Sequence, residues 1–370
     1  MERPTTAEEL AALLAEGRRA RPIGGGTKLR WGAPGPAPEI EISTSGLSSL
    51  VEHNEGDMTA VLQAGLPLAR AQETFASKGQ RLCLDPPDGD GLATVGGVVA
   101  TGDSGPLRHR FGGVRDAILG VRVALSDGTV ARAGSNVIKN VAGYDLAKLM
   151  CGALGTLGVV TEVTMRLHPL AEVSITAVGR GPDRGVLAGA ARALARRPFE
   201  LEGLDLRWDG AEHTGAVLGR AVGRTAHDTA QAAAGVLGDA GLECELVEDD
   251  EAIWAEQRAR QRAENGGAVV RVSPLPTALE QVLKAAPSAV ARAGLGLAWV
   301  RIDDDPAALA EIRARLAPAA CVLLDASAET RAAVDPWGVG EGAELSLLRR
   351  VKERFDPAAV CNPGRFVGGL

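Results

Sequence analysis

The residues best suited to bind a ligand lie in a glycine cluster near the start of the chain, Arg21-Pro22-Ile23-Gly24-Gly25-Gly26-Thr27-Lys28. Consecutive glycines can adopt positive φ and turn several backbone N–H groups toward one anion. Thr27 adds a hydroxyl donor, and Lys28 adds a positive charge. A hydrogen bond to a charged group contributes about 1.5–3 kcal/mol, so about four or five of them would bind a pyrophosphate with nanomolar affinity. A plain glycine turn is the alternative interpretation.

Two further segments consist largely of small residues. The segment from Ala93 to Pro106 reads ATVGGVVATGDSGP, and its small side chains let the main chain approach a flat ring or a phosphate. The segment from Lys139 to Val160 carries Gly152, Gly155 and Gly158 between an expected helix and an expected strand. Main-chain atoms there could hold an adenine or a ribityl chain, although close helix–strand packing explains the same glycines equally well.

Other nucleotide or nucleophile chemistries are disfavoured. Gly102-Asp103-Ser104-Gly105 invites a serine-nucleophile interpretation, but no neighbouring sequence supplies the His and Asp partners that such a site needs. No G-x-G-x-x-G opens a helix at the glycine cluster, and no Gly-Lys pair occurs in the chain. Neither a Rossmann fingerprint nor a P-loop is therefore expected.

The composition is that of an ordinary globular protein. The chain has 370 residues, of which 45% are hydrophobic and 24% charged, and a net charge of −7 argues against nucleic-acid binding. Its length suggests two domains. No signal-peptide pattern and no apolar run of about 18 residues occurs, so we expect a cytoplasmic protein with reduced thiols. No C-x-x-C pair is formed by the scattered cysteines, so no metal site is expected; they are Cys83, Cys151, Cys244, Cys321 and Cys361.

The hydrophobic pattern places the glycine segments between short strands and helices. In the first half we expect helices over 6–17, 67–79 and 144–150, strands over 20–23, 39–44, 59–64, 81–84 and 159–167, and a hairpin within 114–133 around Ser126-Asp127-Gly128-Thr129. After Pro169 we expect helices near 184–197, 226–239, 249–264, 277–287 and 306–317, strands near 201–208, 215–222, 243–247, 268–272, 296–302 and 321–325, and a charged helix over 344–354. Such alternation predicts an α+β layer that covers one face of a sheet.

Together these segments resemble the FAD-binding domain of the vanillyl-alcohol-oxidase/PCMH-type flavoproteins and, within that superfamily, the FAD-binding E subunits of bacterial glycolate oxidases. The resemblance is carried by RPIGGGTK, ATVGG, RFGGVRDAILGV, SDGT, KNVAGYDLAKL, GALGTLGVVTEV and the terminal FDPAAVCNPGRF. It covers residues 5–170 and the tail. It implies an α+β fold with a PCMH-type FAD-binding domain of two α+β subdomains at 1–170. A smaller, shortened α+β cap domain for substrate or interaction would follow at 171–340, and a C-terminal helix and tail at 341–370 would return to the FAD domain.

The resemblance also implies where the cofactor lies. FAD would place its pyrophosphate on the glycine cluster, and Thr27 stands where members with covalent flavin carry the attachment His, so noncovalent FAD is expected. The implied contacts are Pro22, Gly24, Gly25, Gly26, Thr27, Lys28, Thr94, Gly96, Gly97, Ser104, Gly105, Gly155, Gly158, Val159 and Val160. A fixed cation near the ring would stabilise the charge of reduced flavin, and the weak candidates for this catalytic role are Arg108, His109, Arg110 and Arg365. A solvated arginine is the alternative interpretation of each.

The implied function is oxidation of glycolate, or a similar small 2-hydroxy acid, to the 2-oxo acid. The implied partners are a larger FAD-binding glycolate oxidase subunit and an iron–sulfur subunit, with at most peripheral membrane association through them and no nucleic acid. Related flavoproteins that oxidise 2-hydroxy acids carry H-x-G-D-G-N-x-H in the cap, which this chain lacks. Two alternatives therefore stay open: an FAD-binding structural or assembly subunit without turnover, and a stand-alone FAD-dependent alcohol or lactone oxidase.

Overall fold

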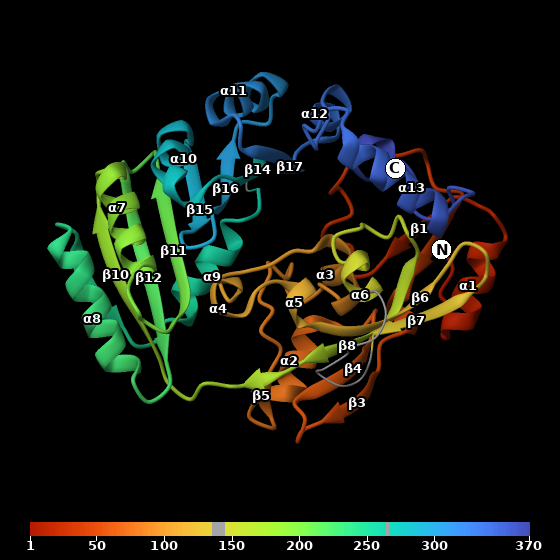
Figure 1. Ribbon diagram of the computed structural model, residues 1–370, viewed down its shortest axis with the longest axis horizontal. Coiled ribbons are helices and arrows are strands. Elements are labelled where there is room, and N and C mark those ends of the chain that lie inside the picture. Colours follow the sequence, from red (N-terminus) through yellow and green to blue (C-terminus); the bar gives the residue numbers. More distant parts are fainter. Residues whose placement is uncertain (135–144, 264–265) are drawn as a thin grey trace. The chain divides into compact units, whose positions relative to one another are not determined.

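The computed structural model describes residues 1–134, 145–263 and 266–370, and both of its compact units combine helices with sheets (Figure 1). The first unit comprises Met1–Ser104, Phe111–Leu170 and Val339–Leu370, and the second comprises Gly105–Arg110 and Ala171–Gly338. The fold is thus α+β, and the C-terminal helix and tail return to the first unit. Within the described ranges, no helix is both long and apolar enough to cross a membrane. The Lys139–Tyr144 part of the third glycine segment lies outside the described residues.

An antiparallel sheet of five strands, in the order β3-β4-β8-β6-β7, forms the base of the first unit. Its strands are β3 (Leu50–Asn54), β4 (Thr59–Gln63), β6 (Ile118–Ala124), β7 (Val130–Gly134) and β8 (Val159–Arg166). The helices of this unit include α1 (Ala7–Ala15), α2 (Leu68–Ala76), α3 (Val95–Thr101), α5 (Val114–Ala117), α6 (Leu146–Met150) and α13 (Ala343–Phe355). Phe75 of α2 and Val99 of α3 are fully buried in a hydrophobic core that also contains Val163 and Met165 of the central strand β8. The expected hairpin is β6–β7.

Two small pairings complete the first unit. Strands β1 (Ala20–Ile23) and β2 (Ile40–Ser43) run parallel, and β5 (Gln80–Arg81) pairs with β9 (His168–Pro169). The tail extends the first pairing, because Ala20 also forms a parallel bridge with Cys361. The glycine cluster, which follows β1 directly, is therefore anchored to the C-terminal tail through its own strand.

An antiparallel sheet of eight strands, in the order β13-β10-β12-β11-β15-β16-β14-β17, forms the second unit. Its strands are β10 (Ser174–Gly181), β11 (Leu201–Asp209), β12 (Thr214–Val222), β13 (Glu243–Val247), β14 (Ala268–Ser273), β15 (Ser288–Arg292), β16 (Leu297–Ile302) and β17 (Ala320–Asp325). Helices α7 (Arg184–Ala195), α8 (Ala226–Asp239), α10 (Leu279–Ala285) and α11 (Pro306–Leu316) share one hydrophobic core with the sheet (Figure 1). Helix α9 (Glu251–Ala259) packs with Trp254 on residues of the opposite face.

The remaining short helices are α4 (Arg108–Phe111) and α12 (Ala328–Ala333), with 3₁₀ turns η1 (Thr44–Gly46), η2 (Pro276–Ala278) and η3 (Val367–Gly369). Several elements differ from the pattern-based expectation, and the strand expected over 81–84 is the two-residue β5. Strands β3, β10 and β15 were not expected, the helix expected over 249–264 is the shorter α9, and the small-residue run after Thr94 is the helix α3. Glycine is a poor helix former, so α3 depends on its context: Thr94 caps its first turn and Gly102 ends it with φ +64°.

Candidate functional site

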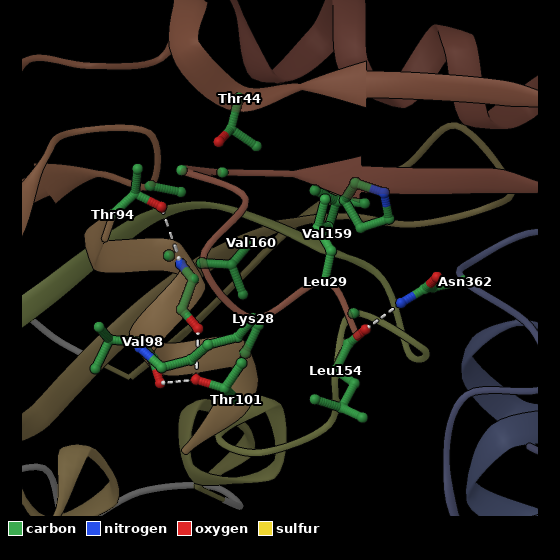
Figure 2. Close-up of a pocket in the computed structure, with 18 of the residues that line it drawn as sticks. Lys28, Leu29, Thr44, Thr94, Val98, Thr101, Leu154, Val159, Val160 and Asn362 are labelled. Atoms are coloured by element: carbon green, nitrogen blue, oxygen red, sulfur yellow. Dashed lines mark hydrogen bonds between the residues drawn. The ribbon is translucent and has the colours of Figure 1, made fainter. Parts of the chain in front are cut away.

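A cleft of about 980 Å³, open to solvent, lies in the first unit beside the glycine cluster (Figure 2). Three stretches of the chain and the C-terminal tail form most of its walls. Its lining residues are Arg21, Pro22, Gly24–Leu29, Trp31, Thr44, Ala64, Ala93, Thr94, Gly96–Val98, Ala100, Thr101, Met150, Ala153–Gly155, Gly158–Val160, Asn362 and Arg365. None of these residues is acidic, so the cleft suits an anionic ligand.

The glycine cluster forms a wall that only glycine can form. A Cβ on Gly25 would lie 1.6 Å from the carbonyl oxygen of Leu92, and one on Gly24 would lie 2.3 Å from Oγ1 of Thr94. Gly26 has φ +75°, which is the left-handed region. Among hydrogen bonds between described residues, none uses the backbone amides of these three glycines. Their amides are therefore available to a ligand, as expected of an anion-binding nest.

Helix α3 forms the second part of the wall. Oγ1 of Thr94 accepts a hydrogen bond from the amide of Gly97 at 3.2 Å, and the hydroxyl of Thr101 donates to the carbonyl of Gly97 at 2.8 Å (Figure 2). A Cβ on Gly96 would lie 2.5 Å from Cβ of Ala64, at the end of β4. The backbone of α3 at Gly96 thus packs directly against the end of the sheet. The small side chains of α3 leave room beside the helix for a flat ligand.

Lys28 forms an ion pair inside the protein. Its ammonium lies 3.1 Å from Oδ2 of Asp103 and donates to the carbonyl oxygen of Pro87 at 2.8 Å. Both side chains are about 95% buried, with 5% and 4% of their surface exposed. This differs from the expectation that Lys28 offers its charge to a pyrophosphate. The pair instead connects the glycine cluster to the loop that follows α3.

The third stretch of wall comes from the loop before β8 and from β8 itself. Gly155 and Gly158 have φ of +72° and +148°, and Leu154 has φ +53°, which is rare for a residue with a branched side chain. Two hydrogen bonds hold Leu154 in place: its amide donates to Ala100 at 2.7 Å, and its carbonyl accepts from the Asn362 side chain at 2.7 Å (Figure 2). This loop is therefore positioned by α3 and by the tail.

The tail supplies the last two lining residues, Asn362 and Arg365. Arg365 donates through one nitrogen to the carbonyl oxygens of Leu29 and Trp31, the latter at 2.6 Å. Burial, and then the nearby charge of Arg21, lower the pKa of Arg365. Arg21 forms an ion pair with Glu41 on the neighbouring strand β2.

The predicted cofactor contacts converge on this cleft. Pro22, Gly24–Lys28, Thr94, Gly96, Gly97, Gly155, Gly158, Val159 and Val160 all lie in its wall. Ser104 and Gly105 do not: Ser104 is buried beside Asp103, and Gly105 begins the short segment that belongs to the second unit. The loop after α3 therefore extends past the cleft instead of lining it.

Of the weak catalytic candidates, only Arg365 lines the cleft. Arg108, His109 and Arg110 belong to the second unit, where Arg110 lies 3.2 Å from the carboxylate of Glu200. Burial, and then the charge of Arg110, lower the pKa of His109. No acceptor or donor among the described residues lies within hydrogen-bond distance of its buried Nδ1.

Sequence reasoning missed Trp31, Thr44 and Ala64 as lining residues. Thr44 and Ala64 follow directly on the ends of β2 and β4. Both could have been predicted from the sequence as the residues that directly follow expected strands near a glycine loop. Trp31 has no such signal, because it lies in an irregular segment after the glycine cluster.

The glycine-lined cleft without acidic side chains suits an anionic ligand, and comparison with known proteins indicates which class of ligand this is. Residues 2–134 match the family described as FAD binding domain. Over these residues the chain is similar to an FAD-binding domain, which supports FAD as its cofactor. The glycine contacts and the available amides of the cleft fit this ligand.

Three curated relatives are similar over part of the chain. Glycolate oxidase subunit GlcE of Escherichia coli (strain K12) is 40% identical over 127 residues, 34% of this chain and 36% of that protein. The mitochondrial D-lactate dehydrogenase (cytochrome) of Arabidopsis thaliana is 32% identical over 55% of this chain and 36% of that protein. Glycolate oxidase subunit GlcD of Bacillus subtilis (strain 168) is 32% identical over 42% of this chain and 33% of that protein. The matched region thus spans about a third of the length of each relative.

The whole fold has a counterpart among solved structures. Alkyldihydroxyacetonephosphate synthase superimposes with a TM-score of 0.72 over 98% of this chain and 76% of that chain, at 16% identity. At this identity the likeness establishes the fold alone. It extends over both units, whereas the sequence family match covers only part of the first.

Proposed function

We propose that this protein is an FAD-dependent oxidoreductase that oxidises glycolate or a similar 2-hydroxy acid to the 2-oxo acid. The observation that carries the proposal is the glycine cradle, in which three amides make no hydrogen bond to any described residue and no acidic side chain lines the cleft. When bound, FAD accepts the two electrons released as the hydroxyl carbon becomes a carbonyl. Similarity to proteins named glycolate oxidase subunits and D-lactate dehydrogenase supports this choice of substrate class.

In this proposal the chain's own residues bind and orient the cofactor. The amides of Gly24–Gly26 would hold the diphosphate, and the open backbone of Gly96 and Gly97 would lie against the flexible part of the flavin. The other parts of the cofactor would contact the cleft wall at Thr94, Gly155, Val159 and Val160. These contacts are preorganised, because the Thr94 cap and the Lys28–Asp103 pair already hold the loops in place.

We further propose that the protein acts as a subunit, together with a larger FAD-binding glycolate oxidase subunit and an iron–sulfur subunit. Two of the relatives are named as subunits of glycolate oxidase, which supports assembly. The five cysteines of this chain are scattered and form no C-x-x-C pair of the kind that binds an iron–sulfur cluster. An electron acceptor that contains an iron–sulfur cluster would therefore be supplied by another chain.

The visible absorption spectrum of the purified chain tests this proposal. We expect an oxidised-flavin spectrum from noncovalent FAD, which denaturation releases into solution, and bleaching when glycolate is added without oxygen. D-Lactate and a sugar lactone serve as alternative substrates in the same assay. Bleaching only by the lactone would instead identify a stand-alone lactone oxidase.

A flavin that stays oxidised with every acid would overturn catalysis by this chain alone. If bleaching then appears when the larger subunit is added, substrate oxidation belongs to the complex. If the added subunit bleaches equally well by itself, this chain has a structural or assembly role. A colourless chain that FAD cannot reconstitute would contradict the assignment as a whole.

A further inference from the structure

Polar side chains that are completely buried lie between helix α9 and the sheet of the second unit. Asp205 of β11, Arg292 of β15 and Gln257 of α9 each have 0% of their surface exposed. Gln261, which follows the helix, is 1% exposed. Near its start α9 packs on the same face of the sheet with the apolar ring of Trp254. Beyond that ring, the helix is attached to the sheet through these polar groups.

One carboxylate oxygen of Asp205 accepts the hydrogen bonds of this layer. Oδ2 accepts from Nη1 of Arg292 at 2.6 Å and from Nε2 of Gln257 at 3.2 Å. The guanidinium also donates to the side-chain oxygen of Gln261, and its Cζ lies 4.7 Å from the centre of the Trp299 ring. An aromatic face attracts a cation most strongly where water is excluded, so the ring helps to stabilise the buried charge of Arg292.

Two buried acceptors in this layer lack a donor. Among the described residues, neither Oδ1 of Asp205 nor Oε1 of Gln257 has a hydrogen-bond partner. These atoms belong to a carboxyl and a carboxamide that one hydrogen bond already joins. Buried acceptors without a donor are costly, and a proton on the carboxyl would satisfy both atoms at once. Oδ1–H would donate to Oε1, and the two groups would then share a pair of hydrogen bonds.

We propose that Asp205 and Gln257 form a proton-binding site that fastens α9 to the sheet when the proton is bound. The carboxylate takes up one proton from solvent on Oδ1, which becomes a donor to Oε1 of Gln257. The bond from Nε2 to Oδ2 remains. The site gains one positive charge, which stays on Arg292 beside the Trp299 ring. Lowering the pH thus adds a hydrogen bond between β11 and α9.

The charges around Asp205 are compatible with proton uptake in mild acid. Burial raises the pKa of its carboxyl to about 6, and the charge of Arg292 opposes this shift. Charged groups on the neighbouring elements pair with one another: Glu256 of α9 with Arg207 of β11 at 2.6 Å, Arg260 with Asp209 of β11 at 3.4 Å, and Arg220 of β12 with Asp250 at 2.8 Å and Glu202 at 3.8 Å. Of these acids, Asp205 alone has a buried oxygen without a partner among the described residues.

The pH dependence of one substitution tests the inference by its sign. Hydrogen exchange of the α9 amides in the full-length chain, corrected for the intrinsic effect of pH, measures how firmly the helix is attached. If Oδ1–H bonds to Oε1, the protection lost in Gln257→Leu should be about fivefold greater at pH 5 than at pH 7. If Gln257 only donates to the carboxylate, the loss should be smaller at pH 5, because protonation weakens that bond.

Gln261→Leu is the matched control, because it removes a second buried glutamine from the same layer. Its loss of protection should be equal at pH 5 and pH 7. Asp205→Asn imitates the protonated carboxyl, since its side-chain nitrogen can donate to Oε1 of Gln257 at every pH. In that variant α9 should be as well protected at pH 7 as at pH 5.

Infrared spectroscopy gives a second readout, which does not depend on the Gln257 variant being folded. At pH 5 the native chain should show a protonated-carboxyl band that is missing from Asp205→Asn. Gln257→Leu should shift this band toward that of a carboxyl without a hydrogen-bond acceptor. No such band in the native chain, or a loss of protection in Gln257→Leu that shrinks toward pH 5, would overturn the inference. Neither measurement depends on the assignment of FAD to the cleft.

Discussion

At the scale of single residues, the Lys28–Asp103 pair explains how the glycine cluster keeps its position. Glycines lose more backbone freedom on folding than other residues, so a loop of three needs anchors. Lys28 binds both Asp103 and the carbonyl oxygen of Pro87, and therefore joins three segments around the cleft. The sequence placed Lys28 in the cluster, but only the fold shows that a carboxylate 75 residues later neutralises its charge.

Substitution of this pair distinguishes a positioning role from phosphate binding by the sign of one effect. If Lys28 were a phosphate ligand restrained by Asp103, Asp103→Asn would free its charge and tighten FAD binding. We expect weaker FAD binding from both Asp103→Asn and Lys28→Met, because breaking a buried ion pair costs about 3–5 kcal/mol and loosens the loops. The double variant should recover part of the lost stability, which thermal unfolding with and without FAD would measure.

The exposed pair Lys78–Glu55 provides the control, since both side chains are about half exposed, at 51% and 52%. Lys78→Met should change neither stability nor FAD affinity by more than about 0.5 kcal/mol. Tighter FAD binding by Asp103→Asn would contradict the positioning role and return Lys28 to the diphosphate.

At the scale of elements, the sequence predicted those helices and strands whose own residues show the hydrophobic periodicity of a helix or a strand. Strand β11 was expected because Leu204, Leu206 and Trp208 occupy alternate positions between charged residues. Strand β15 was missed because Ser288–Arg292 is short and rich in alanine, and Arg292 at its end is buried for a reason that lies in other elements. Helix α3 was missed because its two glycines favour a loop, and only the caps and packing make it helical.

That buried arginine belongs to a polar layer between helix α9 and the sheet. Arg292 pairs with Asp205 at 2.6 Å, with neither side chain exposed, and its guanidinium lies 4.7 Å from the Trp299 ring. Gln257 of α9 donates to the same carboxylate at 3.2 Å. Burial raises the pKa of Asp205 to about 6, despite the opposing charge of Arg292.

This raised pKa predicts how the second unit responds to acid. The native state takes up a proton on Asp205 near pH 6, whereas the unfolded chain does so near its ordinary value of 3.8, so lowering the pH between these values favours the native state. We expect the difference in unfolding free energy between the native chain and Asp205→Asn to grow by about 3 kcal/mol from pH 7 to pH 4. Urea titrations would follow it through Trp208, Trp254 and Trp299, all of which are buried in this unit.

Asp228 serves as the control for this effect, because its side chain is 93% exposed. The same urea titrations on Asp228→Asn give the baseline for the loss of one exposed carboxylate. A difference for Asp205→Asn that shrinks as the pH falls would show that the pair with Arg292, and not burial, dominates its titration.

At the scale of the whole molecule, the cleft proposed to bind FAD is completed only by the C-terminal tail. The family match ends at residue 134, yet the cleft is also lined by Leu154, Gly155, Gly158–Val160 and the tail residues Asn362 and Arg365. Lys352 of α13 connects the tail to this wall, because its ammonium donates to the carbonyl oxygen of Thr156 at 2.6 Å and pairs with Asp356 at 2.5 Å. The sequence indicated that the tail returns to this domain, but the atoms it binds depend on long-range contacts that no local pattern encodes.

Removal of the tail tests this dependence. A chain ending at Gly338 should lose FAD, because the Leu154 carbonyl would lose its bond from Asn362 and the carbonyl oxygens of Leu29 and Trp31 would lose Arg365. The second unit contains no part of the tail, so its buried tryptophans should keep their fluorescence.

The substitution Lys352→Met disrupts the attachment of the tail without removing it. We expect it to lower the stability of the first unit by about 3–5 kcal/mol and to speed the release of FAD. Lys284→Met removes an exposed lysine from a pair of the same i,i+4 spacing and should have no such effect. FAD retained at native affinity by the chain ending at Gly338 would show that the three stretches before the tail suffice to build the cleft.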